Sequence, residues 1–264
     1  MSALSLGTPT RSLRPGIEES VFIGRSLRHS LRNIDALIMA IMLPVVLMLL
    51  FTFVFGGALD EGGDYVDYVV PGIILLCAGF GSAGTAVDVA NDMETGIIDR
   101  FRTMPIRSWA VLTGHVVASL ARNLFATAVV LGVALLVGFR PDATPLEWLA
   151  AFGIISLYIL AITYLFAAIG LAARSAEAAN GYTFILMFLP YLSSAFVPID
   201  TLPVWLRWVA ENQPITPIIE SIRGLLLGTD PGAAPLWALG WCAVILLAAI
   251  VWAAAVFRRK GARR

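Results

Sequence analysis

Long stretches without charge constrain this chain more than any other feature of its sequence. Six stretches of at least 17 residues contain no Asp, Glu, Lys or Arg, and together they make up about half of the 264 residues. A bilayer hydrocarbon core about 30 Å thick requires roughly 20 residues of α-helix. We therefore predict an all-α polytopic membrane protein with six transmembrane helices, spanning about residues 35–58, 68–90, 111–139, 148–172, 179–198 and 234–257.

The composition excludes several other classes of protein. The chain is 59% hydrophobic and only 14% charged, whereas a soluble domain carries about 25% charged residues. Its formal net charge is zero, so the basic surface that nucleic-acid binding requires is missing, and we expect no nucleic-acid partner. Cys77 and Cys242 both lie inside uncharged stretches, where we expect free core thiols rather than a disulfide.

The distribution of Arg and Lys predicts the orientation. If the six spans are counted, fourteen basic residues fall in the two termini and in the loops after the second and fourth spans. Three, Arg140, Arg207 and Arg223, fall on the opposite side, where the first loop is acidic. The positive-inside rule then places both termini in the cytoplasm. The abundance of Arg over Lys is typical of a GC-rich bacterial genome, so we expect a multi-pass protein of the bacterial plasma (inner) membrane.

The N-terminal region divides into two parts. Residues 1–16, rich in Ser, Thr and Pro, predict a disordered cytoplasmic tail. Over residues 17–33 the apolar side chains fall on one side of a helical wheel and are flanked by Arg25, Arg28 and Arg32. This pattern predicts an amphipathic helix in the cytoplasmic membrane interface, with its arginines reaching the lipid headgroups. An ordinary lead-in to the first span is the alternative.

The segment between the fifth and sixth spans is too polar to cross a bilayer and too apolar for a surface loop. It contains Trp205, Trp208 and several prolines. We predict short helices that enter the outer leaflet and are interrupted at the prolines, with tryptophans at the interface. Irregular backbone at that depth must be covered by protein or by water. The candidate residues of this re-entrant segment are Pro214, Pro217, Glu220 and Arg223.

Motifs for nucleotide binding or catalysis fail their tests. Residues 79–84 match G-x-G-x-x-G, but no strand precedes them and their flanks are apolar, so close helix packing is the better interpretation. The only lysine, Lys260, lies in the C-terminal tail, which excludes a G-x-x-x-x-G-K-[ST] phosphate loop. His29 and His115 have no further metal ligands at suitable spacing. We therefore expect the chain itself not to be an enzyme, and to hold no metal or cofactor.

The most polar segment follows the second span. A short stretch there combines charged residues with apolar ones that a plain solvated loop does not need, which indicates a surface for docking on another protein. A solvated loop is the alternative. The candidate docking residues are Asp92, Glu94, Thr95, Gly96, Ile97, Ile98, Asp99, Arg100, Phe101, Arg102, Met104 and Pro105.

Two charged residues fall near the membrane on neighbouring spans. Arg122 lies in the cytoplasmic third of the third span, and Asp88 lies at a similar depth in the second. An Arg in hydrocarbon costs about 2.5–3.5 kcal/mol on insertion scales, so an ion pair between the two is a reasonable hypothesis. The alternative is that Arg122 extends to the headgroups.

Four local patterns, read in order, resemble a known family. They are Pro71-Gly72, the run from Asp92 to Pro105, the run from Ala195 to Pro198, and the run from Gln213 to Gly228. Over about residues 17–260 the chain resembles the membrane subunit of type-2 ATP-binding-cassette (ABC) exporters, in particular the daunorubicin-resistance-type permeases. The resemblance assigns residues 34–260 to the transmembrane domain.

The resemblance implies a half-transporter without a motor of its own. Residues 92–105 would form a coupling helix that docks on a separate ATPase subunit, and the helix over 17–33 would also touch that subunit. Two permease chains, identical or homologous, and two ATPase chains would make the working assembly in the lipid membrane. ATP and magnesium would be bound by the ATPase partner and not by this chain.

The sequence does not identify the cargo. The family implied by the resemblance exports lipophilic drugs, lipids, polysaccharides and lipo-oligosaccharides, and a hydrophobic drug or natural product is our first choice. An ion-coupled secondary transporter is an alternative, although it would need acids near the membrane midplane. A lipid-modifying enzyme or an assembly factor are further alternatives. The aromatic residues proposed to face a path are Phe80, Tyr158, Tyr164, Phe184, Phe188, Tyr191 and Phe196.

Overall fold

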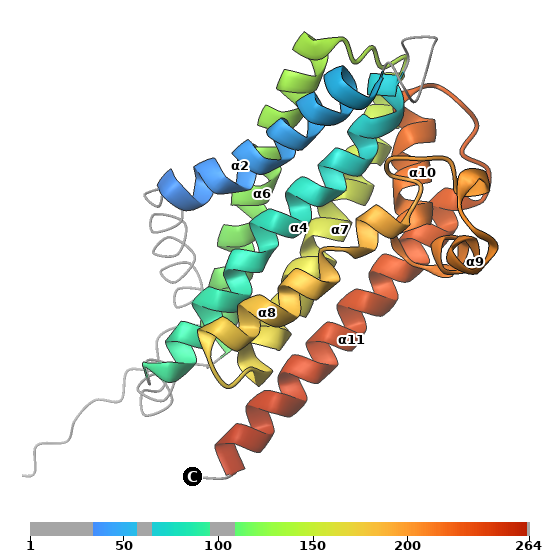
Figure 1. Cartoon of the computed structure of the whole chain (residues 1–264). Helices are drawn as coiled ribbons and strands as arrows, with labels where there is room; N and C mark the ends of the chain where they lie inside the picture. The colour runs from blue at the N-terminus through green and yellow to red at the C-terminus, as the bar shows by residue number, and fades with distance from the viewer. Residues whose placement is uncertain (1–33, 57–64, 96–108, 263–264) are drawn as a thin grey trace, which may run out of the picture.

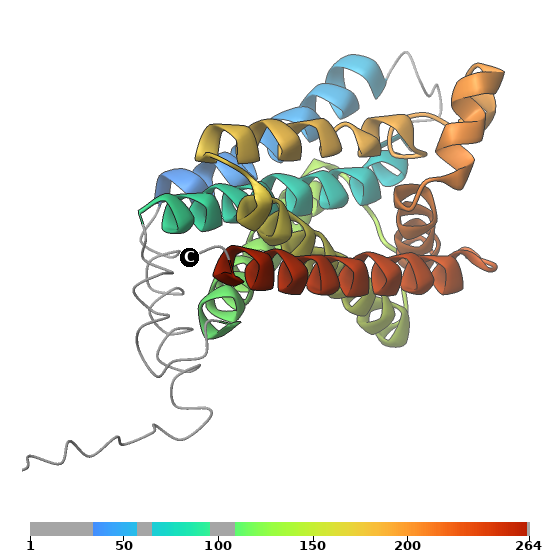
Figure 2. The same cartoon turned by 90° about the horizontal axis from the view of Figure 1, so that it is seen from below.

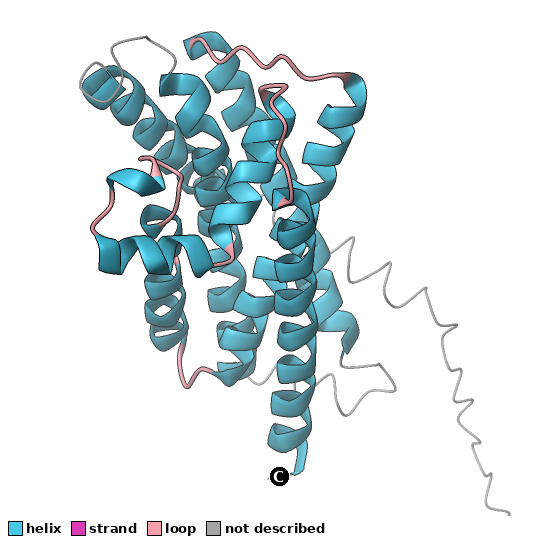
Figure 3. Ribbon diagram, turned by 90° about the vertical axis from the view of Figure 1, so that its right-hand side faces the viewer, coloured by secondary structure: helices cyan, strands magenta, loops and turns pink. Residues whose placement is uncertain are grey.

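The computed structural model describes residues 34–56, 65–95 and 109–262. Within these ranges the chain is helical and contains no strand, and short loops join the helices (Figure 3). The expectation of an all-α protein is thus confirmed for the part of the chain that the structure describes. The predicted tail over 1–16 and the predicted interfacial helix over 17–33, with Arg25, Arg28 and Arg32, lie outside the described residues.

The elements follow one another as α-helices, interrupted by short π-helical or 3₁₀ turns labelled η. Their order along the chain is α2 (Ile34–Leu49), η1 (Leu50–Phe55), α4 (Tyr65–Glu94), α6 (Trp109–Val137), α7 (Pro145–Ala172), α8 (Ala176–Leu186), η2 (Leu189–Leu192), η3 (Ile199–Thr201), α9 (Val204–Asn212), α10 (Ile215–Leu226) and α11 (Ala234–Ala262).

Helix α4 lies at the centre of the bundle. It packs against α2, α6, α7 and α8, and α11 packs along the far side of α7 (Figures 1 and 2). Nearly every residue of α4 from Tyr65 to Ala78 is buried. The short helices α9 and α10 lie at one end of the bundle, which we call the α10 end (Figure 1). The C-terminus of α4 lies at the opposite end, which we call the Glu94 end.

Small residues allow the helices to approach α4 closely. At Gly170 of α7 an added Cβ would lie 2.3 Å from the Ala86 carbonyl oxygen, and at Gly81 it would lie 1.6 Å from Asn123 Oδ1. Backbones can approach this closely only where side chains are small. Gly81 belongs to the G-x-G-x-x-G match, so the structure agrees that this pattern serves helix packing.

Four helices are long and apolar enough to cross a membrane. They are Tyr65–Glu94, Leu112–Val137, Pro145–Ala172 and Ala234–Arg259, and they correspond to the second, third, fourth and sixth predicted spans. The first predicted span corresponds to a shorter apolar helix, Ala40–Phe55. Four spans of full length are therefore found in the described residues, and the count of six is not confirmed.

The fifth predicted span is not the continuous helix expected over residues 179–198. Helix α8 ends at Leu186, and the chain continues through the turn η2 into an irregular segment. Pro190 explains where the helix stops, because a proline clashes with the carbonyl group four residues earlier and has no N–H to donate to it. That earlier residue is Leu186. The absence of charge predicts only that this stretch is buried in lipid or in protein. Pro190 determines where its helix ends.

Two short helices occupy the segment between α8 and α11. Pro203 precedes α9, and Pro214 precedes α10, so each helix begins directly after a proline. Pro217 lies in the first turn of α10, where its missing N–H costs no hydrogen bond. The prediction that prolines divide this segment into short helices is confirmed, while its depth in the membrane stays a prediction.

Candidate functional site

A row of six aromatic side chains runs across one face of the bundle. It begins on η1, directly after α2, with ring centroids 5.6 Å apart between Phe55 and Phe51 and 4.3 Å between Phe51 and Phe196. It continues from Phe196 to Tyr191 at 5.2 Å and from Tyr191 to Phe188 at 6.1 Å. The last step, from Phe188 to Phe184 on α8, is 5.2 Å with the rings nearly perpendicular. We call these six residues the aromatic row.

The row is buried in its middle and open at its ends. Phe196 is only 6% exposed, whereas Phe184 and Phe188 are 57% and 52% exposed and Phe55 is 43% exposed. The row therefore connects η1, which follows α2, to α8 and presents ring surface outward at both ends. Phe51 and Phe55 lie in the uncharged stretch 36–59, and the other four rings lie in the uncharged stretch 178–199, so neither stretch offers a charge to a bound molecule.

The structure separates the seven aromatic residues that the sequence proposed for a path. It brings Phe184, Phe188, Tyr191 and Phe196 together in the row. Tyr158 is buried in the core, and Phe80 and Tyr164 are partly buried against core clusters. Phe51 and Phe55 were not predicted from the sequence, because an aromatic residue in a continuous apolar stretch gives no periodic signal of the helix face that it occupies.

Polar side chains meet inside the bundle where α4, α6 and α7 pack together. Arg122, which is 8% exposed, donates from Nη2 to the Gly81 carbonyl at 2.9 Å. The Asn123 amide donates to the Ser82 hydroxyl at 3.0 Å, and Ser82 in turn bonds Thr163 at the same distance. These bonds satisfy polar groups that lipid cannot satisfy. Arg122 thus binds the same helix that carries Asp88, which is exposed, and the Asp88–Arg122 ion pair stays a prediction.

The Glu94 end of α4 is joined to two neighbouring helices by carboxylates. His115 Nε2 on α6 lies 2.8 Å from Asp92 Oδ2, and the backbone N–H of Ala176, the first residue of α8, donates to Glu94 Oε1 at 2.9 Å. Asp92 and Glu94 were both predicted to contact an ATPase, and the structure places their side chains against α6 and α8. The partner of His115 could not be predicted from the sequence, because Asp92 lies 23 positions away and no local spacing relates the two residues.

Most of the predicted coupling helix cannot be placed. Thr95 lies in the turn after α4, where its hydroxyl donates to the Asn91 carbonyl at 2.9 Å. The other members lie outside the described residues, namely Gly96, Ile97, Ile98, Asp99, Arg100, Phe101, Arg102, Met104 and Pro105.

Arg223 of α10 connects the α10 end to α4 and to the irregular segment after α8. It donates to the Tyr68 carbonyl at 3.0 Å and to the Ser194 carbonyl at 2.6 Å, and its guanidinium lies 3.8 Å from the centre of the Tyr68 ring. Tyr65 adds a bond to the Phe196 carbonyl at 2.8 Å. These two side chains therefore bind carbonyl groups of the irregular segment after α8, which lies within the predicted fifth span. Burial raises the pKa of Glu220, one turn before Arg223, and the positive charge of Arg223 opposes that rise.

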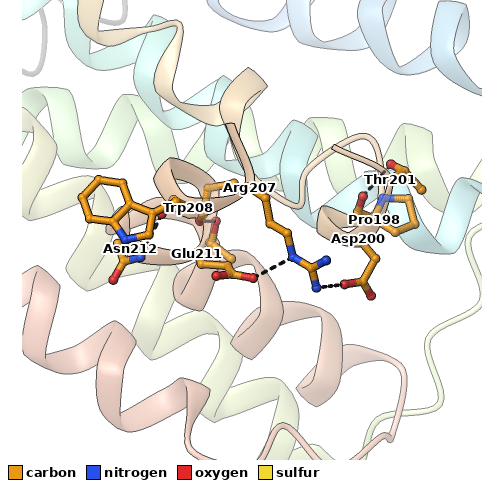
Figure 4. Close-up of polar contacts among 9 residues, drawn as sticks. Pro198, Asp200, Thr201, Arg207, Trp208, Glu211 and Asn212 are labelled. Atoms are coloured by element: carbon orange, nitrogen blue, oxygen red, sulfur yellow. Dashed lines mark hydrogen bonds and ion pairs between the residues drawn. The ribbon is translucent and has the colours of Figure 1, made fainter. Parts of the chain in front are cut away.

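Helix α9 carries its own charged contacts on the surface of the α10 end. Arg207 lies between Asp200 and Glu211 and pairs with both carboxylates (Figure 4). The hydrogen bond that Arg207 donates to Glu211 and the negative charge of Asp200 raise the pKa of Arg207. Trp205 and Trp208 on the same helix are 72% and 68% exposed. Exposed indole rings beside paired charges are typical of a membrane–water interface.

The bend after α8 leaves an apolar pocket among α4, α7 and α8, lined by residues that include Tyr158, Phe166 and Pro190. Its interior has room for roughly one water molecule. Pockets that hold drug-sized ligands measure about 300–1,000 Å³, so this pocket is too small to hold one.

In the described part of the chain, four helices long and apolar enough to cross a membrane, with polar side chains hydrogen-bonded between them, are typical of a multi-pass membrane protein. The sequence matches the family described as ABC-2 type transporter over residues 19–227, so the chain belongs to the ABC-2 type transporter family. It is a permease subunit of an ATP-driven exporter. Permeases of this family normally work with an ATPase subunit.

Named relatives agree with this assignment. The chain is 29% identical over 206 residues to the daunorubicin resistance ABC transporter permease protein DrrB1 of Streptomyces coeruleorubidus, covering 77% of this chain and 71% of that one. It is 25% identical over 229 residues to the probable doxorubicin resistance ABC transporter permease protein DrrC of Mycobacterium tuberculosis, covering 83% and 82%. It is also 26% identical over 200 residues to the probable multidrug ABC transporter permease YbhR of Escherichia coli, covering 75% and 54%. The resemblance found in the sequence is thereby confirmed.

Proposed function

We propose that this permease exports a lipophilic aromatic compound, a drug or natural product, along the face formed by α2, α4 and α8. The observation that carries this proposal is the aromatic row, whose open rings are Phe184 on α8, Phe188 shortly after it and Phe55 on η1. Offset or edge-on contact between aromatic rings contributes about 0.5–1.5 kcal/mol beyond the apolar area that it buries. A row of such contacts would let a flat molecule exchange one ring for the next. Two relatives are named for resistance to such compounds, daunorubicin in one case and doxorubicin in the other.

The working assembly is proposed to contain two permease chains and two ATPase subunits. The pocket behind α8 has room for about one water and would not hold a cargo. We place the path between two chains that face each other across their aromatic rows. The second permease chain would be a copy of this one or a homologue. ATP binding and hydrolysis in the partner subunits would supply the state-dependent free energy that a transport cycle requires.

The proposed orientation places the Glu94 end in the cytoplasm of a bacterial cell. The support is the count over the whole sequence, fourteen basic residues on one side against three on the other. Within the described residues, Arg174, Arg258 and Arg259 lie at the Glu94 end, and Arg140, Arg207 and Arg223 lie at the α10 end. Residues 92–105 would then contact the ATPase as a coupling helix, beginning at the C-terminus of α4. Helices α9 and α10 would close the outer side, with Trp205 and Trp208 in the outer interface.

The test is ATP-dependent export of doxorubicin from cells or vesicles that contain the permease and its ATPase partner. We expect the double substitution F184A/F188A to reduce export by roughly tenfold, since two stacking contacts of about 0.5–1.5 kcal/mol each are removed. W237A is the matched control, because Trp237 is an equally open aromatic (64% exposed) on α11. Equal export by the two variants would refute a path along the aromatic row. An unmodified complex that hydrolyses ATP but never moves doxorubicin would refute the cargo class.

A further inference from the structure

Helix α4 ends in two carboxylates that bind two different helices. Its last residue, Glu94, accepts a hydrogen bond from the first N–H of α8, and Asp92 lies 2.8 Å from His115 on α6. The chain beyond α4 enters the segment proposed to receive the ATPase. Any displacement of that segment must therefore act first on the final turn of α4, where these two contacts lie.

The contact with α8 extends a line of close packing. Ala78, Ser82, Ala86 and Ala90 occupy one side of α4 at four-residue spacing, and Ala86 and Ala90 share an apolar cluster with Ala179 of α8. Glu94 is the next position on that line, one turn beyond Ala90. Ala176 lies one turn before Ala179. The polar contact thus sits directly beyond the packed surface, at the end where α4 and α8 meet (Figure 1).

Helix α8 needs this carboxylate at its N-terminus. The first N–H groups of a helix lack partners within the helix. Ser175 satisfies one of them locally, because its hydroxyl accepts from the N–H of Ala178 at 3.2 Å. The N–H of Ala176 is satisfied from α4 instead. A carboxylate is also the favoured charge at this end of the helix dipole.

The contact with α6 lies on a different side of α4. Val89 and Met93 pack in the cluster that contains Leu112 and Val116 of α6, and Asp92 meets His115 between those two positions. Side chains at these spacings share one face of a helix. The two acids therefore divide the end of α4 between two neighbours, with Glu94 directed to α8 and Asp92 directed to α6.

We propose that Glu94 and Asp92 are the positioning residues that transmit the ATPase stroke to α8 and to α6, respectively. This inference rests on the proposed function in one respect, that an ATPase binds next to α4. It assigns to two of the predicted docking residues a different role, since their carboxylates hold neighbouring helices of the same chain. Through Glu94, a movement of the α4 terminus would carry α8 and with it Phe184 and Phe188.

The test measures amide hydrogen exchange of the whole permease–ATPase complex in phosphatidylethanolamine–phosphatidylglycerol nanodiscs, with and without ATP and vanadate. In the unmodified complex we expect nucleotide to change exchange in both α8 and α6. In E94A the α8 response should be lost while the α6 response remains. In H115A the pattern should be reversed. E94Q should retain the α8 response, because an amide oxygen still accepts from the Ala176 N–H.

A matched control is E147A. Glu147 also accepts at a helix N-terminus, from the Thr144 N–H at 2.7 Å, but at the other end of α7. E147A should leave the responses of α8 and α6 unchanged. If E147A also lost them, the losses in E94A and H115A would reflect a general loss of stability.

Three results would overturn the inference. One is an unchanged α8 response in E94A, and another is an equal loss of both responses in E94A and H115A. The third is an active ATPase in the unmodified complex with no response in α8. If no ATPase binds the permease at all, the proposed function and this inference fail together, whereas the first three results leave the proposed function intact.

Discussion

Helices α4 and α11 are almost equal in length and opposite in environment. Within its most apolar window α4 has a mean hydropathy of 1.7 and is 67% buried by the rest of the chain, whereas α11 has a mean hydropathy of 2.5 and is only 17% buried. The more hydrophobic helix is thus the one that the protein covers least. In water the opposite would hold, because burial in protein follows hydrophobicity.

The difference follows from the solvent. Lipid tails are as apolar as leucine, so a helix gains nothing by moving its large apolar side chains from lipid into protein. What favours contact is close approach, which α4 achieves through Gly72, Gly81 and the line from Ala78 to Ala90. Helix α11 instead directs Leu236, Trp237, Leu247 and Val251 outward. Small residues therefore mark the places where helices of this protein approach most closely, and an apolar sequence alone does not distinguish a covered helix from an open one.

The largest predicted effect is the difference in stability between two truncations, one in α4 and one in α11. Ile73 of α4 is fully buried, and Leu247 of α11 is 63% exposed. We expect I73A to lower the free energy of unfolding by about 2–5 kcal/mol, because it leaves a cavity in packed protein, and L247A to change it by less than about 0.5 kcal/mol. Unfolding by sodium dodecyl sulfate in mixed micelles measures both. A cost for L247A close to that of I73A would show that protein rather than lipid covers α11.

A smaller effect is expected where only one methyl group is added. Gly170 and Gly153 belong to the same helix, α7, but a Cβ at Gly170 would meet the Ala86 backbone at 2.3 Å, and a Cβ at Gly153 would meet nothing within 4 Å. Overpacking costs about 1–3 kcal/mol, so G170A should destabilise the protein by that amount. G153A should be neutral or slightly stabilising, because alanine favours helix. Thermal unfolding in detergent compares the two, and similar melting temperatures would show that α4 and α7 are not in close contact there.

The same reasoning explains how much the sequence could predict. Charge-free length identified the helices at 68–90, 111–139, 148–172 and 234–257 with ends correct to within a few residues, since lipid thickness fixes their length. It failed over 179–198, because hydropathy does not register that Pro190 ends α8. The GxGxxG segment was correctly assigned to packing, but its partner Asn123 was not predictable, because contacts between distant segments leave no spacing in one sequence.

The candidate site was predictable in its residue types and not in its pairings. The sequence identified Asp92 and Glu94 as functional candidates at the end of α4, and it identified Arg223 in the segment after the fifth span. It gave no partner for any of them. Those partners are a histidine 23 positions away, a backbone N–H 82 positions away and a carbonyl 29 positions away. Of these, the two backbone groups carry no information in residue identity at all.

Burial and hydrogen bonding also shift the pKa values of two acids outside the long spans, Glu220 on α10 and Glu177 on α8, in opposite directions. Burial raises the pKa of Glu220, so the folded chain binds a proton there more readily than the unfolded chain. Its contribution to stability is complete below the ordinary pKa of an unfolded Glu and is lost as the pH rises through the raised value. Hydrogen bonds from its own backbone N–H and from Ser175 lower the pKa of Glu177 on α8. Its contribution is present above the ordinary pKa and is lost as the pH falls through the lowered value.

These opposite signs give the smallest predicted effect, which appears in the slope of stability against pH rather than at one pH. Relative to the unmodified chain, E220Q should lose less stability as the pH rises from about 4 to about 7, because the group that releases its proton at cost is gone. E177Q should show the reverse and lose less stability as the pH falls from about 5 to about 3. Melting temperatures across both ranges measure the slopes. If the melting temperatures of E220Q and of the unmodified chain changed with pH in parallel, Glu220 would be freely accessible to water. Helix α10 would then not be packed against the bundle at this position.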